Sequence, residues 1–130
     1  MSAEQEVQAM MEHIFSAAAK GDFIPFANAL DEDLEVFDHV ACRFDTRNSF
    51  LAYLQSAMGR AESTTFDVHQ PSYRVFGDAA AVANTYDRAA TIPKGGGPAR
   101  VQCGRTTLVY VKRGTNWKIV SAHFSPMPKE

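Results

Sequence analysis

The sequence predicts an α+β fold in which helices come first and strands follow. Apolar residues recur at helical spacing in two stretches of the first half of the chain, and a glycine ends each stretch, Gly21 and Gly59. From Thr64 onward the pattern changes to long runs rich in β-branched and aromatic residues, separated by turn-forming residues. Helices followed by such a meander predict helices packed on one face of a curved antiparallel sheet.

Three helices are predicted. The first covers residues 3–20, where apolar side chains lie three or four positions apart. Asp22 can cap a short second helix through Phe23–Leu30. Asp45 or Thr46 can cap a third helix, which runs to the second glycine named above.

Five strands are predicted, one before the third helix and four after it. In chain order they are Leu34–Asp38, Thr64–Phe76, Ala79–Ile92, Arg100–Lys112 and Trp117–Ser125. Pro71 interrupts the second of these, which indicates an edge strand or a bulge at that point. Residues 93–98 contain three glycines and form a flexible loop; no Lys-Ser/Thr pair follows them, so they are not a phosphate-binding loop.

The last two strands form a long hairpin whose register decides which side chains share a face. A three-residue turn, Gly114–Asn116, pairs Thr107 with His123. It separates a polar face from an apolar one: the first holds Arg105, Thr107, Ser121 and His123, the second Leu108, Tyr110, Val120, Ala122 and Phe124. A two- or four-residue turn instead sets Arg105 opposite Phe124. We favour the three-residue turn, and either face could line a pocket.

Length and composition exclude several classes of protein. A chain of 130 residues is expected to form a single domain over residues 1–130 and to bury a core without disulfides. The net charge of −2 and the absence of a basic run argue against nucleic-acid or anionic-membrane binding. No apolar stretch approaches the roughly 20 residues that span a bilayer. Two cysteines without metal-binding spacing and an acidic N-terminus predict a cytoplasmic protein with reduced thiols.

The final hairpin carries a resemblance to a known family. Gly104–Arg113, the turn after it and Trp117–Ser125 resemble the C-terminal hairpin of SnoaL-like proteins. In element order the chain is similar to the nuclear transport factor 2-like superfamily, and most of all to the association domain of calcium/calmodulin-dependent kinase II and its small bacterial relatives. The resemblance implies a cystatin-like, cone-shaped sheet wrapped around the N-terminal helices, with a pocket between them and a sheet face that forms a homodimer.

The resemblance also names a candidate catalytic residue. Val36–Val40 resembles the ketosteroid-isomerase branch, in which an Asp at the position of Asp38 moves a proton across the substrate. That reaction needs an oxyanion donor, usually a Tyr of the first helix, and this helix has none. The pocket arginines of the kinase association domain are also missing, since Leu108 and Phe124 occupy those positions. Both departures favour a more apolar pocket.

Other candidate site residues come from the strands and the third helix. His123 can act as an acid or base near neutral pH, and Arg105 either binds an anion or pairs with Asp87 or Asp67. Asn84, Tyr86 and Arg88 recur at strand spacing and form a second polar stripe, either a pocket lining or an exposed face. Tyr53 and Tyr110 could each supply a hydroxyl to the pocket, or belong to the core.

Two functions follow from these residues. The first is a homodimeric module that binds a small hydrophobic or aromatic molecule, with Tyr53, Tyr86, Arg88, Arg105, Leu108, Tyr110 and Phe124 as its ligand-binding residues. The second is a cofactor-free isomerase, cyclase or dehydratase that uses Asp38 or His123 as acid or base. No metal site is predicted, because the four histidines, His39 among them, have no mutual spacing that suggests one.

Overall fold

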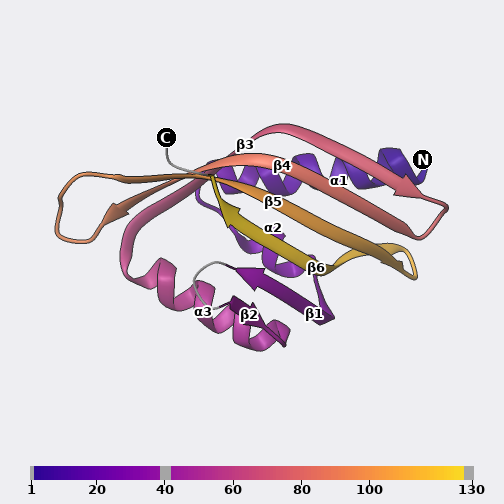
Figure 1. Ribbon diagram of the computed structural model, residues 1–130, viewed down its shortest axis with the longest axis horizontal. Coiled ribbons are helices and arrows are strands. Elements are labelled where there is room, and N and C mark those ends of the chain that lie inside the picture. The colour runs from indigo at the N-terminus through magenta and orange to yellow at the C-terminus, as the bar shows by residue number, and fades with distance from the viewer. Residues whose placement is uncertain (1, 39–41, 128–130) are drawn as a thin grey trace.

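The computed structural model describes residues 2–38 and 42–127, in which three helices pack on one face of a six-stranded curved sheet (Figure 1). The helices are α1 (Ala3–Ala19), α2 (Ile24–Asn28) and α3 (Arg47–Gly59). The strands are β1 (Leu30–Asp38), β2 (Cys42–Phe44), β3 (Ala61–Phe76), β4 (Ala80–Pro93), β5 (Arg100–Arg113) and β6 (Asn116–Pro126). The predicted α+β class, with helices on one side of a curved sheet, is confirmed.

Capping side chains begin the two longer helices. Ser2 accepts a hydrogen bond from the backbone N–H of Gln5, whose side chain accepts one from the backbone N–H of Ser2, so α1 starts with a capping box. Thr46, one of the two predicted caps, accepts from the backbone N–H of Ser49 at 3.1 Å and begins α3.

The second helix is shorter than predicted. It ends at Asn28, because Leu30 already pairs with Ile119 as the first residue of β1. Asp22 accepts from the backbone N–H of Ile24 at 3.1 Å, although it does not occupy the N-cap position. The strand predicted at Leu34–Asp38 therefore starts four residues earlier than expected.

The sheet order is β2-β1-β6-β5-β4-β3, and every neighbouring pair is antiparallel except β1 and β6, which are parallel. The short strand β2 was not predicted, because three residues carry too little alternation to be recognised. Pro71 lies in a register shift between His69 and Ser72 on the edge strand β3, and Gln70 beside it has a φ of 51°. The prediction of an edge strand or bulge at Pro71 is confirmed.

The final hairpin has the predicted pairing of its strands beyond the turn, but its turn is shorter than predicted and one strand contains a bulge. Arg113 pairs with Asn116 across a two-residue turn, so the predicted three-residue turn is wrong. A bulge at Val120 supplies the extra residue and restores the predicted pairing of Thr107 with His123. Leu108, Tyr110, Ala122 and Phe124 of the predicted apolar face accordingly turn toward the helices, and the polar face turns away. Val120 was wrongly placed on the apolar face, because Ile119 takes the inward position before the bulge.

The hydrophobic core lies between the helices and the inner face of the sheet, which is the face that the helices cover. It joins α1 and α3 to four strands through buried side chains, including Val7, Met11, Leu34, Phe50, Leu108, Tyr110 and Ile119. The hydroxyl of Tyr110 donates a hydrogen bond to the sulfur of Met11. No helix in the described ranges is long and apolar enough to cross a membrane.

Two polar clusters fix the turn end of the final hairpin. Glu6 of α1 accepts from Trp117 Nε1 at 3.1 Å and pairs with Lys112 at 3.2 Å, and these partners lower the pKa of the Glu6 carboxyl. On the other side of the turn, Arg113 donates to both carboxylate oxygens of the buried Asp31, at 3.2 and 3.3 Å. The hydrogen bonds from Arg113 lower the pKa of Asp31 against the opposing effect of burial.

Candidate functional site: a cavity between the helices and the sheet

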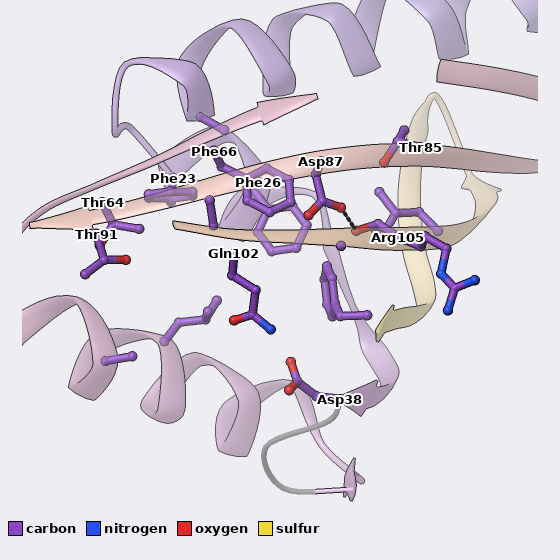
Figure 2. Close-up of a pocket in the computed structure, with 18 of the residues that line it drawn as sticks. Phe23, Phe26, Asp38, Thr64, Phe66, Thr85, Asp87, Thr91, Gln102 and Arg105 are labelled. Atoms are coloured by element: carbon purple, nitrogen blue, oxygen red, sulfur yellow. Dashed lines mark hydrogen bonds between the residues drawn. The ribbon is translucent and has the colours of Figure 1, made fainter. Parts of the chain in front are cut away.

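A cavity of about 370 Å³ lies between the three helices and the inner face of the sheet (Figure 2). Most of its surface is apolar. Its aromatic lining residues are Phe15, Phe23, Phe26, Phe50, Tyr53, Phe66 and Phe124, and aliphatic side chains such as Ile14, Leu54 and Leu108 also line it. The lining residues differ in burial, so the cavity has a buried inner end, which includes Phe50, and an exposed rim, which includes Met58.

Strand alternation supplies the sheet side of the cavity. Successive side chains on a strand point to opposite faces, so every second residue meets the cavity. On β4 these are Thr85, Asp87, Ala89 and Thr91, and on β5 they are Gln102, Gly104, Thr106 and Leu108. The residues between them face away from the helices, although the long side chain of Arg105 also reaches the rim of the cavity.

A carboxyl group lies at the inner end of this apolar cavity. Asp87 is 8% exposed and accepts a hydrogen bond from Thr106 Oγ1 at 2.7 Å. Burial raises the pKa of Asp87, while the hydrogen bond from Thr106 and the charge of His69 act in the opposite direction. A carboxyl group with a raised pKa in an apolar cavity can hold or exchange a proton closer to neutral pH than an exposed Asp can.

Gly104 makes room for this carboxyl group. It pairs with Asp87 across the β4–β5 ladder, and a Cβ at position 104 would lie 3.0 Å from Asp87 Oδ1 and 3.0 Å from the carbonyl oxygen of Ser125. A contact of 3.0 Å is tighter than nearly all Cβ contacts in proteins, so a larger residue here would push the carboxyl group or the β6 backbone aside by a few tenths of an ångström.

Thr85 adds a second polar group to the inner end. It is 6% exposed, and its Oγ1 is a buried oxygen that has no hydrogen-bond partner within the described residues. It pairs across the ladder with Thr106, the donor to Asp87. Three hydrogen-bonding side chains therefore lie together on the inner face, and one of them has an unmet bond.

Asp38 and Tyr53 border a different part of the cavity. Asp38 ends β1, and Tyr53 comes from the middle of α3. The pKa of the Tyr53 hydroxyl is raised, first by burial and second by the negative charge of Asp38. In Figure 2 the side chains of Asp38 and Gln102 point into the same region of the cavity, from β1 and β5.

The structure brings some of the predicted site residues to the cavity and not others. Asp38, Tyr53, Leu108 and Phe124 line it, and Arg105 borders its exposed rim. In Figure 2 the guanidinium group of Arg105 points away from Asp87, so the predicted pairing of these two residues is not formed.

The remaining predicted residues lie elsewhere. Tyr86, Arg88 and His123 are exposed on the outer face of the sheet, which the helices leave uncovered. The ring of His123 packs edge-on against Phe37, with centroids 6.1 Å apart. Tyr110 is fully buried in the core and does not line the cavity. An acid or base role for His123 inside the cavity therefore conflicts with its position.

Sequence reasoning missed Thr85 and Asp87 as cavity residues. It selected the stripe Asn84, Tyr86 and Arg88 on the same strand, which is the outer one. Side-chain size is the signal that could have identified the inner stripe. Thr85 and Asp87 share their face of β4 with three alanines, Ala81, Ala83 and Ala89, whose small side chains leave space beneath the helices.

No group of three or more His, Cys, Asp or Glu side chains within residues 2–38 and 42–127 comes together to hold a metal ion. His39, one of the four histidines of the chain, lies outside the described residues.

Comparison with known families adds to this geometry. A family model for the SnoaL-like domain matches residues 7–130. The chain belongs to the SnoaL-like domain family. The resemblance inferred from the final hairpin is thereby confirmed. Among curated proteins, none is similar in sequence to this SnoaL-like chain.

Several solved structures share the fold of this chain. A nuclear transport factor 2-like protein from Salmonella enterica is 21% identical with a TM-score of 0.79, over 98% of this chain and 92% of that one. A proposed calcium/calmodulin-dependent protein kinase II association domain from Xanthomonas campestris is 23% identical with a TM-score of 0.79, over 97% and 89%. A proposed scytalone dehydratase from Novosphingobium aromaticivorans is 14% identical with a TM-score of 0.81, over 95% and 83%.

Proposed function

We propose that this SnoaL-like domain binds a small apolar or aromatic molecule in the cavity between its helices and its sheet. The observation that carries the proposal is the cavity itself, about 370 Å³ in volume and lined mainly by aromatic and aliphatic side chains. Its volume falls within the range of roughly 300–1,000 Å³ that is common for small-molecule sites.

The packing of the rest of the molecule supports a bound ligand. Protein interiors hold few voids larger than a water molecule, because each void forfeits contacts between the atoms around it. Phe50 and Leu108 are almost fully buried, although both border the open space. A ligand with an apolar body would restore the missing contacts of this lining.

A thermal-shift screen tests the proposal. The intact chain is heated with a panel of small aromatic and alicyclic compounds, and each compound that raises the melting temperature is titrated by calorimetry. A ligand at about 100 times its dissociation constant adds roughly 2.7 kcal/mol of stability. If polar metabolites stabilise the protein and no apolar compound does so, the proposal is wrong.

A second candidate function is a cofactor-free isomerase, cyclase or dehydratase. The observation that favours it is Asp87, a buried carboxyl group whose pKa is raised by desolvation inside an apolar cavity. Asp38 also lines the cavity and is the second candidate acid or base. One protein of similar fold carries the name scytalone dehydratase as a proposal, a likeness of fold alone.

Solvent exchange tests this second candidate without knowledge of the reaction. Compounds that bind in the screen are incubated with the protein in deuterium oxide, and loss of their C–H signals is followed by NMR. A proton-transfer enzyme exchanges an acidic C–H of its ligand, and Asp87→Asn or Asp38→Asn slows that exchange. His123→Ala is the control, since His123 lies on the outer face. Exchange no faster than in buffer argues for binding alone.

We also propose that the chain forms a homodimer through the outer face of its sheet. Phe37 and Tyr86 are 45% and 48% exposed on that face, next to His123 and Arg105 in the neighbouring strand positions. Tyr86→Glu is expected to convert a dimer to a monomer in light scattering, whereas Ile24→Glu on the exposed surface of α2 leaves the mass unchanged. A monomeric wild-type chain would contradict the proposal.

A cytoplasmic location is the last part of the proposal. It draws support from Cys103, a free thiol that is exposed on the surface, where an oxidising compartment would modify it. Fractionation of cells that express the tagged chain tests it, and recovery outside the cytoplasmic fraction would overturn it.

A further inference from the structure

The inner end of the cavity contains a hydroxyl group with an unmet hydrogen bond. Thr85 Oγ1 is enclosed and has no partner within the described part of the chain. Buried polar atoms in native proteins are nearly always paired, so such an oxygen indicates a missing partner. Because Thr85 lines the cavity, a ligand in the cavity can supply that partner.

Asp87 lies on the same face of β4, two residues further along the strand. Its Oδ2 accepts from Thr106, while its Oδ1 lies over the empty side of Gly104. In Figure 2 the hydroxyl oxygen of Thr85 is on the side of that residue nearer Asp87. The Cα atoms of alternate strand residues are roughly 7 Å apart, whereas two hydrogen bonds of about 2.8 Å through one ligand oxygen reach at most about 5.6 Å. One oxygen therefore bridges the pair only where the Thr85 hydroxyl and the Asp87 carboxylate lean toward each other.

The chemistry of these two groups restricts what can bind between them. An ionised carboxylate accepts hydrogen bonds and donates none, whereas a threonine hydroxyl can donate. A ligand hydroxyl accepts from Thr85 and donates to Asp87, so it satisfies both. A ligand carboxylate would face Asp87 with no cation among the buried lining residues, which are Ile14, Ala18, Phe50, Gly104, Thr106 and Leu108 besides these two.

We propose that Thr85 and Asp87 form a subsite for an uncharged hydroxyl group, a phenol or an alcohol, carried by a ligand whose apolar body lies against the phenylalanine rings. The inference rests on the proposed binding function and specifies the polar end of the same ligand. Gly104 is part of the subsite, since a Cβ at this position would lie 3.0 Å from Oδ1 of Asp87.

A matched set of ligands tests the subsite. The probes are 2-naphthol, 2-methylnaphthalene and 2-naphthoate, which share one ring system and differ in a group of similar size. The intact chain is expected to bind 2-naphthol about tenfold more tightly than 2-methylnaphthalene, as a hydrogen bond to a buried charged partner would give. It is expected to bind 2-naphthoate more weakly than either.

A matched pair of variants assigns the preference to the subsite. Thr85→Val keeps the shape of the side chain and removes its hydroxyl, so it is expected to bring the affinities for 2-naphthol and 2-methylnaphthalene close together. Thr107→Val, on the outer face of β5, is the control and keeps the wild-type ratio. If Thr85→Val fails to fold, nuclear Overhauser contacts between the Thr85 methyl group and the protons beside the hydroxyl of bound 2-naphthol test the same geometry in the wild-type chain.

The outcomes separate this inference from the function on which it rests. Binding of 2-naphthol and 2-methylnaphthalene with equal affinity supports the apolar cavity and overturns the hydroxyl subsite. An unchanged preference in Thr85→Val, or a wild-type complex without contacts to Thr85, also overturns it. If none of the three probes binds, the proposed binding function fails together with the subsite.

Discussion

Asp87 and Gly104 face each other across the β4–β5 ladder, and the missing side chain of the glycine is what admits the carboxyl group. A Cβ at position 104 would lie 3.0 Å from Asp87 Oδ1. The carboxyl group is therefore held between Thr106, which donates to it, and a gap in the neighbouring strand. This arrangement explains how Asp87, a residue that is usually charged, is accommodated on the inner face of the sheet among small and apolar residues.

Gly104→Ala is predicted to destabilise the protein and to weaken binding at the inner end of the cavity. The added methyl group forces the Asp87 carboxyl or the β6 backbone to move, and overpacking of this kind costs about 1–3 kcal/mol. Urea denaturation measures the loss. Gly59→Ala is the control: a Cβ at this position, at the end of α3, would have nothing within 4 Å, so the substitution should be neutral or slightly stabilising. Equal effects of the two substitutions would contradict the account.

Asp87→Asn is predicted to change how stability depends on pH. Burial raises the pKa of Asp87 in the folded chain, so on raising the pH the unfolded chain loses this proton first. The free energy of unfolding of the wild type should therefore fall as the pH rises above about 4, the ordinary value for Asp, until the folded pKa is passed. The variant lacks this decline. Urea titrations across that range should give a difference, variant minus wild type, that grows with pH; a constant difference would refute the assignment.

Asp31→Asn is predicted to give the opposite pH dependence. Hydrogen bonds from Arg113 lower the pKa of Asp31 in the folded chain, so its ionised form stabilises the fold above the ordinary Asp pKa. That contribution is lost as the pH falls through the folded pKa. The variant should be less stable than the wild type near neutral pH and approach it in acid. The same urea titrations measure both variants, and a deficit that persists in acid would show that Asp31 acts through packing instead.

Tyr53→Phe and Tyr110→Phe are predicted to differ in their effect on ligand binding. Tyr53 lines the cavity beside Asp38, so loss of its hydroxyl should alter the affinity or the selectivity for polar ligands. Tyr110 is buried in the core and donates to Met11, so its substitution should cost about 1 kcal/mol of stability and leave binding unchanged. Calorimetric titration and thermal denaturation separate the two effects. A change of ligand affinity in Tyr110→Phe would show that Tyr110 takes part in binding, contrary to this prediction.

The sequence was sufficient to predict the class of fold and most of its elements. The helical spacing of apolar residues before residue 60 and the long strands after it survive in the structure with end shifts of a few residues. The start of β1 was missed because Leu30 and Asp31 follow a helix without a break in polarity. The partner that identifies them as strand residues, Ile119, is almost ninety positions away in the chain.

The hairpin shows how a correct pairing can follow from an incorrect turn. The alternation of polar and apolar residues indicated that Thr107 faces His123, and the structure has this pair. A single inserted residue can be placed either in the turn or in a bulge without changing the pattern beyond it. The alternation alone therefore could not predict the bulge at Val120.

The candidate site was harder to predict than the fold. Asp38, Tyr53, Leu108 and Phe124 were selected and do line the cavity, because each follows from the resemblance or from the face of its element. On β4, Tyr86 and Arg88 were named as ligand-binding residues, but they lie on an exposed face, which was the other alternative for their stripe. Both faces of β4 carry some polar residues, so alternation along the strand does not identify the face that the helices cover. That face is set by how the helices pack on the sheet, which involves residues far apart in the sequence.

The most direct test of the central claim compares two neighbouring alanines on β4. Ala89 faces the cavity and Ala90 faces away from the helices, so Ala89→Phe fills the cavity and Ala90→Phe does not. Each variant and the wild type are titrated with 2-naphthol by calorimetry. Loss of binding in Ala89→Phe with wild-type affinity in Ala90→Phe is the predicted result. Wild-type affinity in a folded Ala89→Phe would show that the ligand binds outside the cavity and would contradict the account.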